Sequence, residues 1–312
     1  MVGRVGSHLE TDGSSTAALQ DFTSAAQSQH LRLALAASGR AWPAAASCLS
    51  VSPSPGAAGA ARLAARPNRV ACTIIACNEA DRMERTLRSV AGLVDEIVVV
   101  DSGSSDDTIA LAERYNARVI RNPWVGFGPQ KRFAEDQSSS DWILNLDADE
   151  WLSDALRAEL AEVLAKPQPP TRCFRFRVRV VYPRRDAPAP FAHYHKYVRL
   201  YNRTATRFRD SLTHDEVAPT PDVVQLNGAI LHRSYRDFAH IVTKTIGYYQ
   251  LQRAEGLAPS RLAALRIVFE LPYQFVKYYI FRRHIFGGAD GFAYASALAI
   301  GRWCRIFILR GW

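Results

Sequence analysis

The sequence predicts an α/β protein with a doubly wound sheet, followed by a helical carboxyl-terminal region. From Val70 onward, apolar runs of strand length alternate with helical stretches. This alternation is typical of βαβ units with a parallel sheet and right-handed connections. The apolar runs are continuous, as expected for strands that are buried on both faces.

Each predicted element begins or ends at a local signal. Ser153 is a residue type that caps helices, and it precedes the last helix of this region. The expected elements, in chain order, are strand 70–76, helix 80–91, strand 96–100, helix 107–115, strand 117–121, a Gly/Pro-rich loop at 122–129, a helix from 130, strand 142–146 and helix 153–165. Residues 171–217 are predicted to be β-rich with a Pro-rich break, and residues 236–312 to be helical.

Composition excludes several classes of protein. The chain has 312 residues, of which 48% are hydrophobic and 22% are charged. These values fit a globular protein with a core, and not a fully disordered chain, a collagen-like fibre or a disulfide miniprotein. The five cysteines are odd in number and lack zinc-ligand spacing, which favours a reducing compartment without a structural metal.

Charge is distributed unevenly along the chain, whose net charge is +9. Residues 69–166 carry 11 basic and 18 acidic side chains, whereas 167–230 carry 11 and 5, and 231–312 carry 12 and 4. A nucleic-acid-binding domain would show one continuous basic surface, so that class is disfavoured. The pattern indicates an acidic body that holds cations and a basic end that meets an anionic surface.

Residues 1–68 are rich in Ala, Ser, Gly and Pro and show no sustained periodicity. We predict that this extension is disordered. A targeting segment and a start codon assigned too early are the alternatives, although an apolar patch broken by Arg32 and Arg40 fits a secretory signal poorly.

Polar clusters follow three of the predicted strands, at the edge where open α/β sheets bind ligands. They are Asn78-Glu79, Asp101, and the Asp147-Ala148-Asp149 tripeptide. No GxGxxG or GxxxxGK[ST] motif is present, which disfavours Rossmann dinucleotide binding and P-loop chemistry. Carboxylates in their place predict a divalent cation between protein and phosphate. A helix cap or solvated turn is the alternative for Asp-x-Asp, and a turn-forming role is the alternative for Asp101.

Three of these segments resemble the amino-terminal motifs of family 2 glycosyltransferases, which have the GT-A fold. They are residues 73–79, 95–106 and 141–150, and segment 123–134 resembles the branch that adds sugars to the lipopolysaccharide inner core, the core β-glucosyltransferases. The resemblance covers about residues 69–310. It implies a GT-A (Rossmann-like nucleotide-diphospho-sugar transferase) domain at 69–230, with a nucleotide-sugar half at 69–166 and an acceptor half at 167–230. Residues 231–312 would be a helical, membrane-facing extension.

The resemblance also implies roles for individual residues on the donor side. Asp101 would hydrogen-bond the base or ribose of the nucleotide, with the main chain at Ile75 lining the same pocket and Asn78 and Glu79 at its edge. Cys77 stands where many relatives have Lys or Arg, so a phosphate contact from that position is not expected.

The metal and diphosphate roles fall on the next segments. Asp147 would face the ribose and metal, and Asp149 would ligate Mg²⁺ or Mn²⁺ bridging the diphosphate. Lys131, with Arg132 beside it, fits a phosphate-facing or structural role, and solvated surface is the alternative.

Inverting sugar transfer, the reaction implied, needs a general base on the acceptor side. The segment 210–216 resembles the His-Glu segment of the family and supplies the candidates. We predict Asp215 as the base, then Glu216, with His214 as an orienting group or a metal-side contact. A turn after the strand at Phe208 is the alternative.

Two further motifs narrow the reaction. His193 and His195 share one face of a strand, but no third ligand is evident, so surface or acceptor-site histidines are favoured over a metal site. The Gln-x-x-Arg-Trp motif of processive synthases is absent, which favours addition of a single sugar.

The segment 272–286 mixes aromatic residues with cations, the composition of a helix in the bilayer interface. We predict Lys277, Arg282 and Arg283 as membrane-binding residues. A helix packed on the domain with a solvated basic face is the alternative. No apolar run reaches the roughly 20 residues that span a bilayer, so no transmembrane helix is predicted.

Together these features predict a metal-dependent inverting glycosyltransferase that is peripheral at the cytoplasmic face of the inner membrane. It would move one sugar from a nucleotide-sugar, such as a UDP-hexose, to a glycolipid such as the lipopolysaccharide inner core. The alternatives are a sugar nucleotidyltransferase, which would open with a Gly-rich loop, and a non-catalytic sugar- or lipid-binding protein on the same fold.

Overall fold

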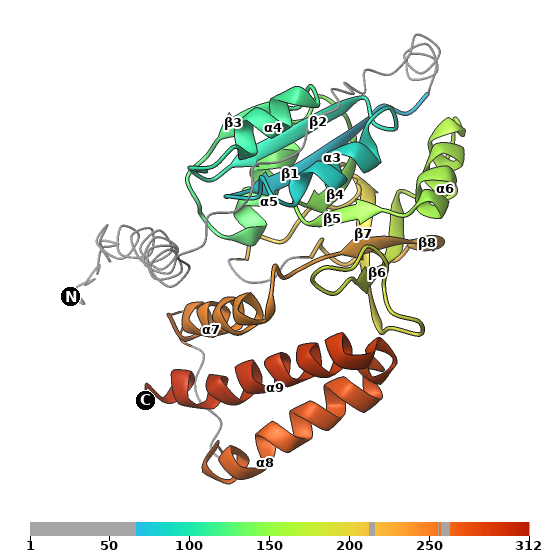
Figure 1. Ribbon diagram of the computed structural model, residues 1–312. Coiled ribbons are helices and arrows are strands. Elements are labelled where there is room, and N and C mark those ends of the chain that lie inside the picture. Colours follow the sequence, from blue (N-terminus) through green and yellow to red (C-terminus); the bar gives the residue numbers. More distant parts are fainter. Residues whose placement is uncertain (1–66, 212–215, 255, 257–262, 312) are drawn as a thin grey trace, which may run out of the picture. The chain divides into compact units, whose positions relative to one another are not determined.

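The computed structural model describes residues 67–211, 216–254, 256 and 263–311 (Figure 1). The predicted disordered extension lies outside the described residues except for its last two. Within the described part, eight strands form one sheet in the order β3-β2-β1-β4-β7-β6-β8-β5. The position of each strand in this order determines which side chains meet at the site.

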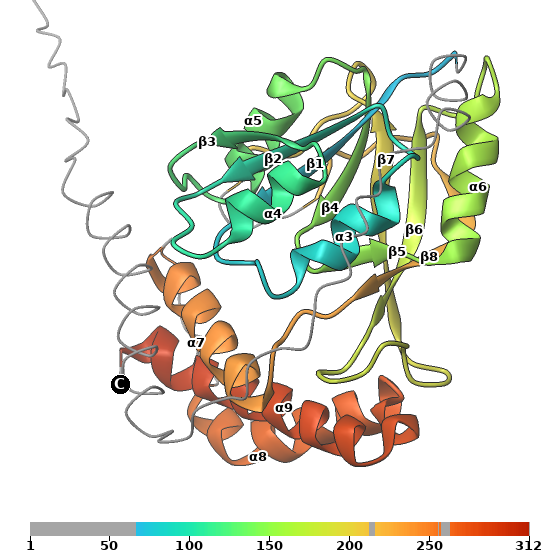
Figure 2. The ribbon, with the colours of Figure 1, turned by 45° about the horizontal axis from the view of Figure 1, so that its top comes forward.

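The amino-terminal half is a parallel, doubly wound unit. Its elements are β1 (Val70–Ala76), α3 (Met83–Val90), β2 (Glu96–Asp101), α4 (Thr108–Arg114), β3 (Arg118–Arg121), α5 (Phe127–Gln137) and β4 (Trp142–Asp147). In one cluster Met83 and Leu87 of α3 pack on Ile74, and in another Ala134 of α5 packs with Val98. Helices therefore cover both faces of this part of the sheet, with α3 and α4 on one side and α5 on the other (Figure 2).

The second half of the sheet is mixed. Its elements are β5 (Glu150–Leu152), α6 (Asp154–Ala165), β6 (Cys173–Val180), β7 (Tyr194–Asn202) and β8 (Val224–His232). Strand β7 is antiparallel to β4 and β6, whereas β8 runs parallel to β6. Strand β5 follows β4 closely in sequence but pairs with β8 at the far side of the sheet. The turn between β4 and β5 therefore joins the two halves of the sheet.

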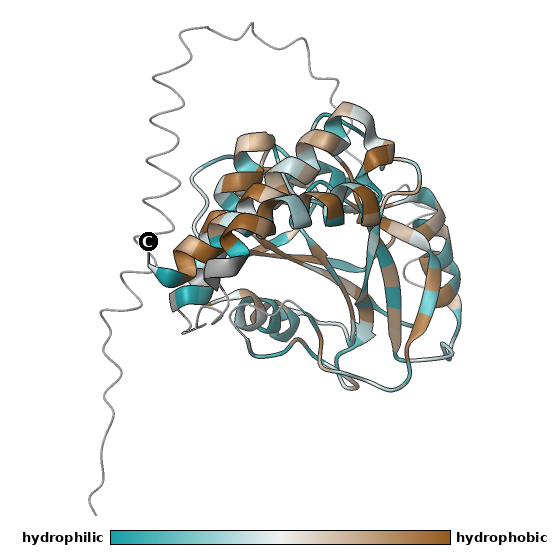
Figure 3. Ribbon diagram, turned by 90° about the horizontal axis from the view of Figure 1, so that it is seen from below, coloured by the Kyte–Doolittle hydropathy of each residue, from teal (hydrophilic) through white to brown (hydrophobic). Residues whose placement is uncertain are grey.

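Four helical elements and a π-helical turn follow the sheet. They are α7 (Phe238–Ala254), α8 (Ala263–Val276), η1 (Lys277–Phe281), η2 (His284–Gly287) and α9 (Gly288–Arg310). Helix α9 packs against α7 and α8, and Tyr294 of α9 shares a cluster with Ile241 of α7 and Tyr182 after β6. Apolar and polar segments alternate along these helices (Figure 3).

The segment His284–Arg310 is long and apolar enough to cross a membrane, with a mean hydropathy of 1.3 over its best window, and a third of that window is buried in the protein. Arg302 and Arg305 interrupt the apolar pattern in the sequence, which is why no run of this length was predicted. The structure continues one helix through both arginines. Length alone therefore does not exclude a spanning helix here.

Most predicted elements of the amino-terminal half are present within a few residues of the expected bounds. Ser153 accepts a hydrogen bond from the backbone N–H of Leu156 at 3.2 Å and so caps α6, as predicted. Helix α5 begins at Phe127, three residues before the expected start, because Pro129 fits the first turn of a helix, where its missing N–H has no partner to lose. Strand β8 lies beyond the predicted β-rich region and was missed.

Candidate active site

Two strand pairings bring an aspartate turn and a histidine together. Asp147 is the last residue of β4, and Asp149 immediately precedes β5. Glu150 pairs with His232 across the β5–β8 ladder, so the end of β8 lies beside this turn. On the other side, Asp147 is in register with Ile75 of β1. Residues distant in sequence thus meet at the carboxyl ends of β1, β4 and β8.

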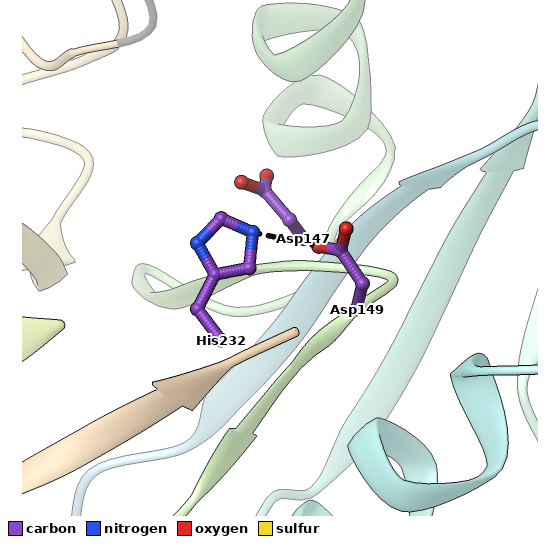
Figure 4. A group of neighbouring side chains, drawn as sticks. All are labelled: Asp147, Asp149 and His232. Carbon is purple, nitrogen blue, oxygen red and sulfur yellow. Dashed lines mark ion pairs between the residues drawn. The ribbon is translucent and has the colours of Figure 1, made fainter. Parts of the chain in front are cut away.

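Asp147, Asp149 and His232 form a group of possible metal ligands (Figure 4). One ligand atom of each lies within 4.8 Å of the others. His232 Nε2 is 3.0 Å from Asp149 Oδ1, and the two side chains face each other across the turn. Two carboxylates and an imidazole are a suitable donor set for Mn²⁺ or Mg²⁺, which bind oxygen ligands and, for Mn²⁺, imidazole as well.

Asp149 is buried but surrounded by cations. Arg82 Nη1 lies 3.0 Å from its Oδ2, and Lys244 Nζ lies 4.0 Å away. Burial alone raises the pKa of this carboxyl, but His232, Lys244 and Arg82 together hold the pKa well below its usual range. Burial lowers the pKa of His232, yet the adjacent Asp149 outweighs it and raises that pKa above the ordinary value. Asp149 is therefore an anion at neutral pH.

Asp147 is held by two other cations. Lys131 Nζ donates to its Oδ1 at 2.7 Å, and Arg199 donates to its Oδ2 at 3.2 Å. The Lys131 side chain is fully buried, and its ammonium lies 4.9 Å from the centre of the Phe208 ring. Burial raises the pKa of Asp147, but Lys131 and Arg199 more than offset this and lower it. Arg199 also binds Glu150 at 3.0 Å and so ties both sides of the turn together.

The chemistry of these side chains suits a divalent cation. The two aspartates are ionised, Lys131 and Arg199 each bind one oxygen of Asp147, and Arg82 binds the Asp149 oxygen that does not face His232. Each carboxylate oxygen has a second lone pair that a cation can use. A metal here would exchange the His232–Asp149 hydrogen bond for two coordinate bonds. The surrounding cations keep the carboxylates oriented in either case.

Asp101 and Asn78 organise the loop that follows β2. Asp101 is buried and its carboxylate accepts hydrogen bonds from the backbone N–H groups of Gly103 and Ser104 at 2.9 Å, and from the Ser104 hydroxyl. Asn78 has a left-handed backbone (φ 56°), and its side-chain oxygen accepts from the N–H of Ser105 at 2.8 Å. The turn-forming role of Asp101, left open by the sequence, is thus present in the structure.

Glu79 belongs to an ion cluster that reaches the aspartate turn. Its carboxylate accepts hydrogen bonds from Arg82 at 2.6 and 2.7 Å and lies 3.4 Å from Arg236. Burial, followed by the repulsion of Asp149, raises the pKa of Glu79 despite these arginines. Because Arg82 contacts both Glu79 and Asp149, it connects the loop after β1 to the possible metal ligands.

Of the predicted catalytic group, His214 and Asp215 lie outside the described residues. The chain on either side is described: Phe208 and Val217 form an antiparallel bridge, and Glu216 is exposed with its carboxylate 3.3 Å from Arg209. The backbone oxygen of Ser211 accepts from the N–H of Gly128 at the start of α5. A Cβ at Gly128 would collide with the backbone oxygens of Arg209 and Ser211, so glycine is required for this close approach.

The structure adds side chains that the sequence analysis missed: His232, Arg199, Arg82, Arg236 and Lys244. His232 ends an apolar strand, so the strand-end rule applied to residues 224–231 would have found it. Arg199 reaches the site from β7, and Arg82, Arg236 and Lys244 reach it from α3, α7 or the residues just before them. No local pattern marks these four side chains.

The chain was compared with known proteins. The family described as "Glycosyl transferase family 2" matches residues 72–220. An uncharacterized glycosyltransferase of Rickettsia felis is 36% identical over 254 residues, which cover 78% of this chain and 89% of that protein. The chain belongs to glycosyltransferase family 2. The predicted family, the enzyme class and the GT-A fold of the catalytic domain are confirmed.

Other similarities of the glycosyltransferase are more limited. The lipopolysaccharide core biosynthesis glycosyltransferase LpsC of Rhizobium meliloti is 43% identical over 97 residues, 30% of this chain and 36% of LpsC. Among solved structures, S. aureus TarS in complex with UDP-GlcNAc matches with a TM-score of 0.42 and 13% identity, covering 74% of this chain and 90% of that one.

Proposed function

We propose that the protein is a metal-dependent, inverting glycosyltransferase that moves one hexose from a UDP-sugar to a glycolipid acceptor such as the lipopolysaccharide inner core. The observation that carries the proposal is the group of Asp147, Asp149 and His232 at the carboxyl ends of the strands. Family membership supports the enzyme class, and the partial similarity to LpsC supports the acceptor class.

The donor nucleotide would bind at the two loops that follow β1 and β2. Asp101 and Asn78 shape the loop after β2. In this proposal the backbone at Ile75 would line the nucleotide pocket and Glu79 would lie at its edge. Lys131 acts on the donor through Asp147, because its ammonium is fully buried against that carboxylate.

Asp147, Asp149 and His232 would hold a Mg²⁺ or Mn²⁺ ion, which when bound neutralises charge on the leaving diphosphate. Arg82, Arg199 and Lys131 fix the two carboxylates in place before donor binding. Such preorganisation lowers the cost of assembling the site during the reaction.

The acceptor hydroxyl requires a base, and Asp215 remains our first candidate, with Glu216 second and His214 as an orienting group. Phe208, which forms a bridge with Val217, has its ring 4.9 Å from the Lys131 ammonium, and that ammonium binds Asp147. Phe208 is thus two contacts away from one of the proposed metal ligands.

Membrane docking is proposed for α8, η1 and η2. The predicted residues Lys277, Arg282 and Arg283 lie on η1 and directly after it. Beside them large apolar side chains are exposed, some in the predicted segment 272–286 and some before it: Val268, Phe269, Tyr273, Val276, Ile280 and Phe281. Exposed apolar residues next to cations suit the interface of an anionic bilayer, in this proposal the cytoplasmic face of the inner membrane.

Isothermal titration of UDP, with and without Mn²⁺, tests the proposal on wild type and Asp149→Asn. Mn²⁺ should strengthen UDP binding to wild type, and Asp149→Asn should weaken the metal-dependent binding by on the order of 10- to 100-fold, the range found when metal-site residues are altered. Asp141→Asn, at an exposed aspartate, is the matched control and should bind like wild type.

Metal-independent binding of UDP would contradict the metal role. Absence of binding by UDP, ADP and GDP alike would contradict the nucleotide-sugar role as a whole.

A further inference from the structure

A row of side chains on β7 connects Arg199 with two histidines beside the proposed metal ligands. His195 and Tyr197 are alternate residues of β7 and point to the same side, and Arg199 follows them at a register shift between β6 and β7. Arg199 binds Asp147 and lies over the ring of Tyr197, at 5.5 Å from its centre. The ring of His195 stacks beside Tyr197 at 6.0 Å, and His193 meets His195 edge-on at 5.0 Å.

The far end of this row meets the segment after η1. Arg282 Nη1 lies 3.1 Å from His195 Nε2, within hydrogen-bond distance. Arg282 is half-buried, whereas Arg283, the next residue, is exposed and has a left-handed backbone (φ 60°). Two adjacent arginines and two histidines thus converge from β7 and from the helical region.

These cations lack acidic compensation. Among the described residues no carboxylate pairs with Arg282 or Arg283, and the nearby Asp290 is 2.6 Å from Arg185 instead. Burial lowers the pKa of His193 and His195, and the charged groups that lower them further are cations, chiefly Arg282. His195 has a pKa of about 4, so it is neutral at pH 7 and accepts the Arg282 N–H.

We propose that His193, Arg282 and Arg283 form a subsite for a phosphate ester carried by the acceptor, beside the sugar-transfer centre at the amino end of β7. The inference rests on the proposed function, because it uses the metal ligands to define that centre. Guanidinium groups bind phosphate oxygens through paired, charge-assisted hydrogen bonds, and these are among the stronger polar contacts in proteins.

The dimensions and surroundings fit such an acceptor. Val178 pairs with His195 on one side and with Ile230 on the other, so two strand spacings, about 10 Å, separate His195 from the part of β8 that ends at His232. This distance suits a short oligosaccharide, with Tyr197 and His195 as its stacking surface. The exposed rings of Phe191 and Phe286 meet at 5.4 Å next to the subsite, so its entrance lies at an apolar surface. A phosphorylated sugar on a membrane-anchored lipid combines both features.

The test is a phosphorus NMR titration of the full chain with glucose 6-phosphate, with saturating UDP and Mg²⁺ present to fill the donor site. Arg282→Gln should weaken glucose 6-phosphate binding by about 10-fold or more, the loss expected for a charge-assisted hydrogen bond. Lys196→Gln is the matched control, because it removes one cation from the opposite face of the same strand. Arg282→Lys keeps the charge and should retain part of the affinity.

A second arm measures sedimentation with vesicles of phosphatidylcholine, with or without phosphatidylglycerol. If Arg282→Gln weakens only the binding to phosphatidylglycerol vesicles, the phosphate subsite stands and its phosphate comes from a lipid headgroup. If neither probe distinguishes Arg282→Gln from wild type, or if Lys196→Gln loses as much affinity, the subsite is overturned.

Two controls keep the outcomes separate. Should Arg282→Gln fail to fold, Arg283→Gln at the exposed neighbouring position gives the same comparison. UDP binding, measured on the same proteins, should be unchanged. If wild type does not bind UDP, the proposed function is contradicted. The subsite would still stand in that case, provided that the affinity for glucose 6-phosphate depends on Arg282.

Discussion

Two groups of cationic side chains in the glycosyltransferase differ in how their positive charges are balanced. One surrounds the aspartate turn, and the other lies at the amino end of β7. At the aspartate turn each carboxylate has cationic partners within the protein: Lys131 and Arg199 for Asp147, and Arg82 and His232 for Asp149. At the end of β7, in the part of the chain that the structure describes, Arg282 has only a neutral histidine and aromatic rings as partners.

This difference indicates which of the two regions has its charges neutralised by other groups of the protein. Balanced charges fix side chains before a ligand arrives, which is the arrangement expected where geometry controls a reaction. Unbalanced cations on a surface gain more from an external anion than from any neighbour in the fold. The first region should therefore lose structure and activity when a charge is removed, and the second should lose affinity for a partner.

The largest expected effect concerns the base. Asp215→Asn should lower the rate of sugar transfer by about 10²- to 10⁴-fold, the usual contribution of a positioned general base. Glu216→Gln should change it by less than about 3-fold, because that exposed side chain already pairs with Arg209. The measurement is release of UDP from UDP-glucose with isolated core glycolipid as acceptor. If wild type and Asp215→Asn transfer sugar at equal rates, Asp215 is not the general base and another residue has that role.

The next effect is on stability in the balanced region. Lys131→Met should lower the free energy of unfolding by about 3 to 5 kcal/mol, because it leaves the Asp147 carboxylate without its buried cation. Lys196→Met, on an exposed side chain, should change it by less than about 0.5 kcal/mol. Urea unfolding followed by circular dichroism provides both values. If Lys131→Met lowers the free energy of unfolding no more than the control does, Arg199 alone stabilises the Asp147 carboxylate.

The same contrast explains what the sequence revealed. Strands β1, β2 and β4 and the Asp-x-Asp turn follow from local patterns, since a buried parallel strand is a continuous apolar run and its ligands come directly after it. Ser153 was recognisable for the same reason, because a helix cap is local. The turn-forming role of Asp101 could be foreseen from the Ser-Gly-Ser segment that follows it.

What the sequence did not reveal depends on pairing between distant segments. His232 reaches Asp149 because β5 crosses to β8, and nothing near Glu150 indicates that crossing. Arg199 is an arginine in a strand that also carries exposed polar residues such as Lys196, yet its guanidinium is buried against two carboxylates. Arg282 was predicted as a membrane contact from composition, whereas only the fold places it against His195.

The smallest expected effect tests the exposed apolar surface beside the unbalanced cations. Phe281 is 75% exposed, and burying a phenylalanine in an apolar phase contributes about 1.5 to 3 kcal/mol, so Phe281→Ser should weaken binding to anionic vesicles by about 10-fold. Val125→Ser removes an exposed apolar side chain before α5 and serves as the control. Vesicle sedimentation measures both variants. If Phe281→Ser sediments with vesicles like wild type, Phe281 is not a bilayer contact. Binding would then depend on the cations alone, and added salt should release the protein from the vesicles almost completely.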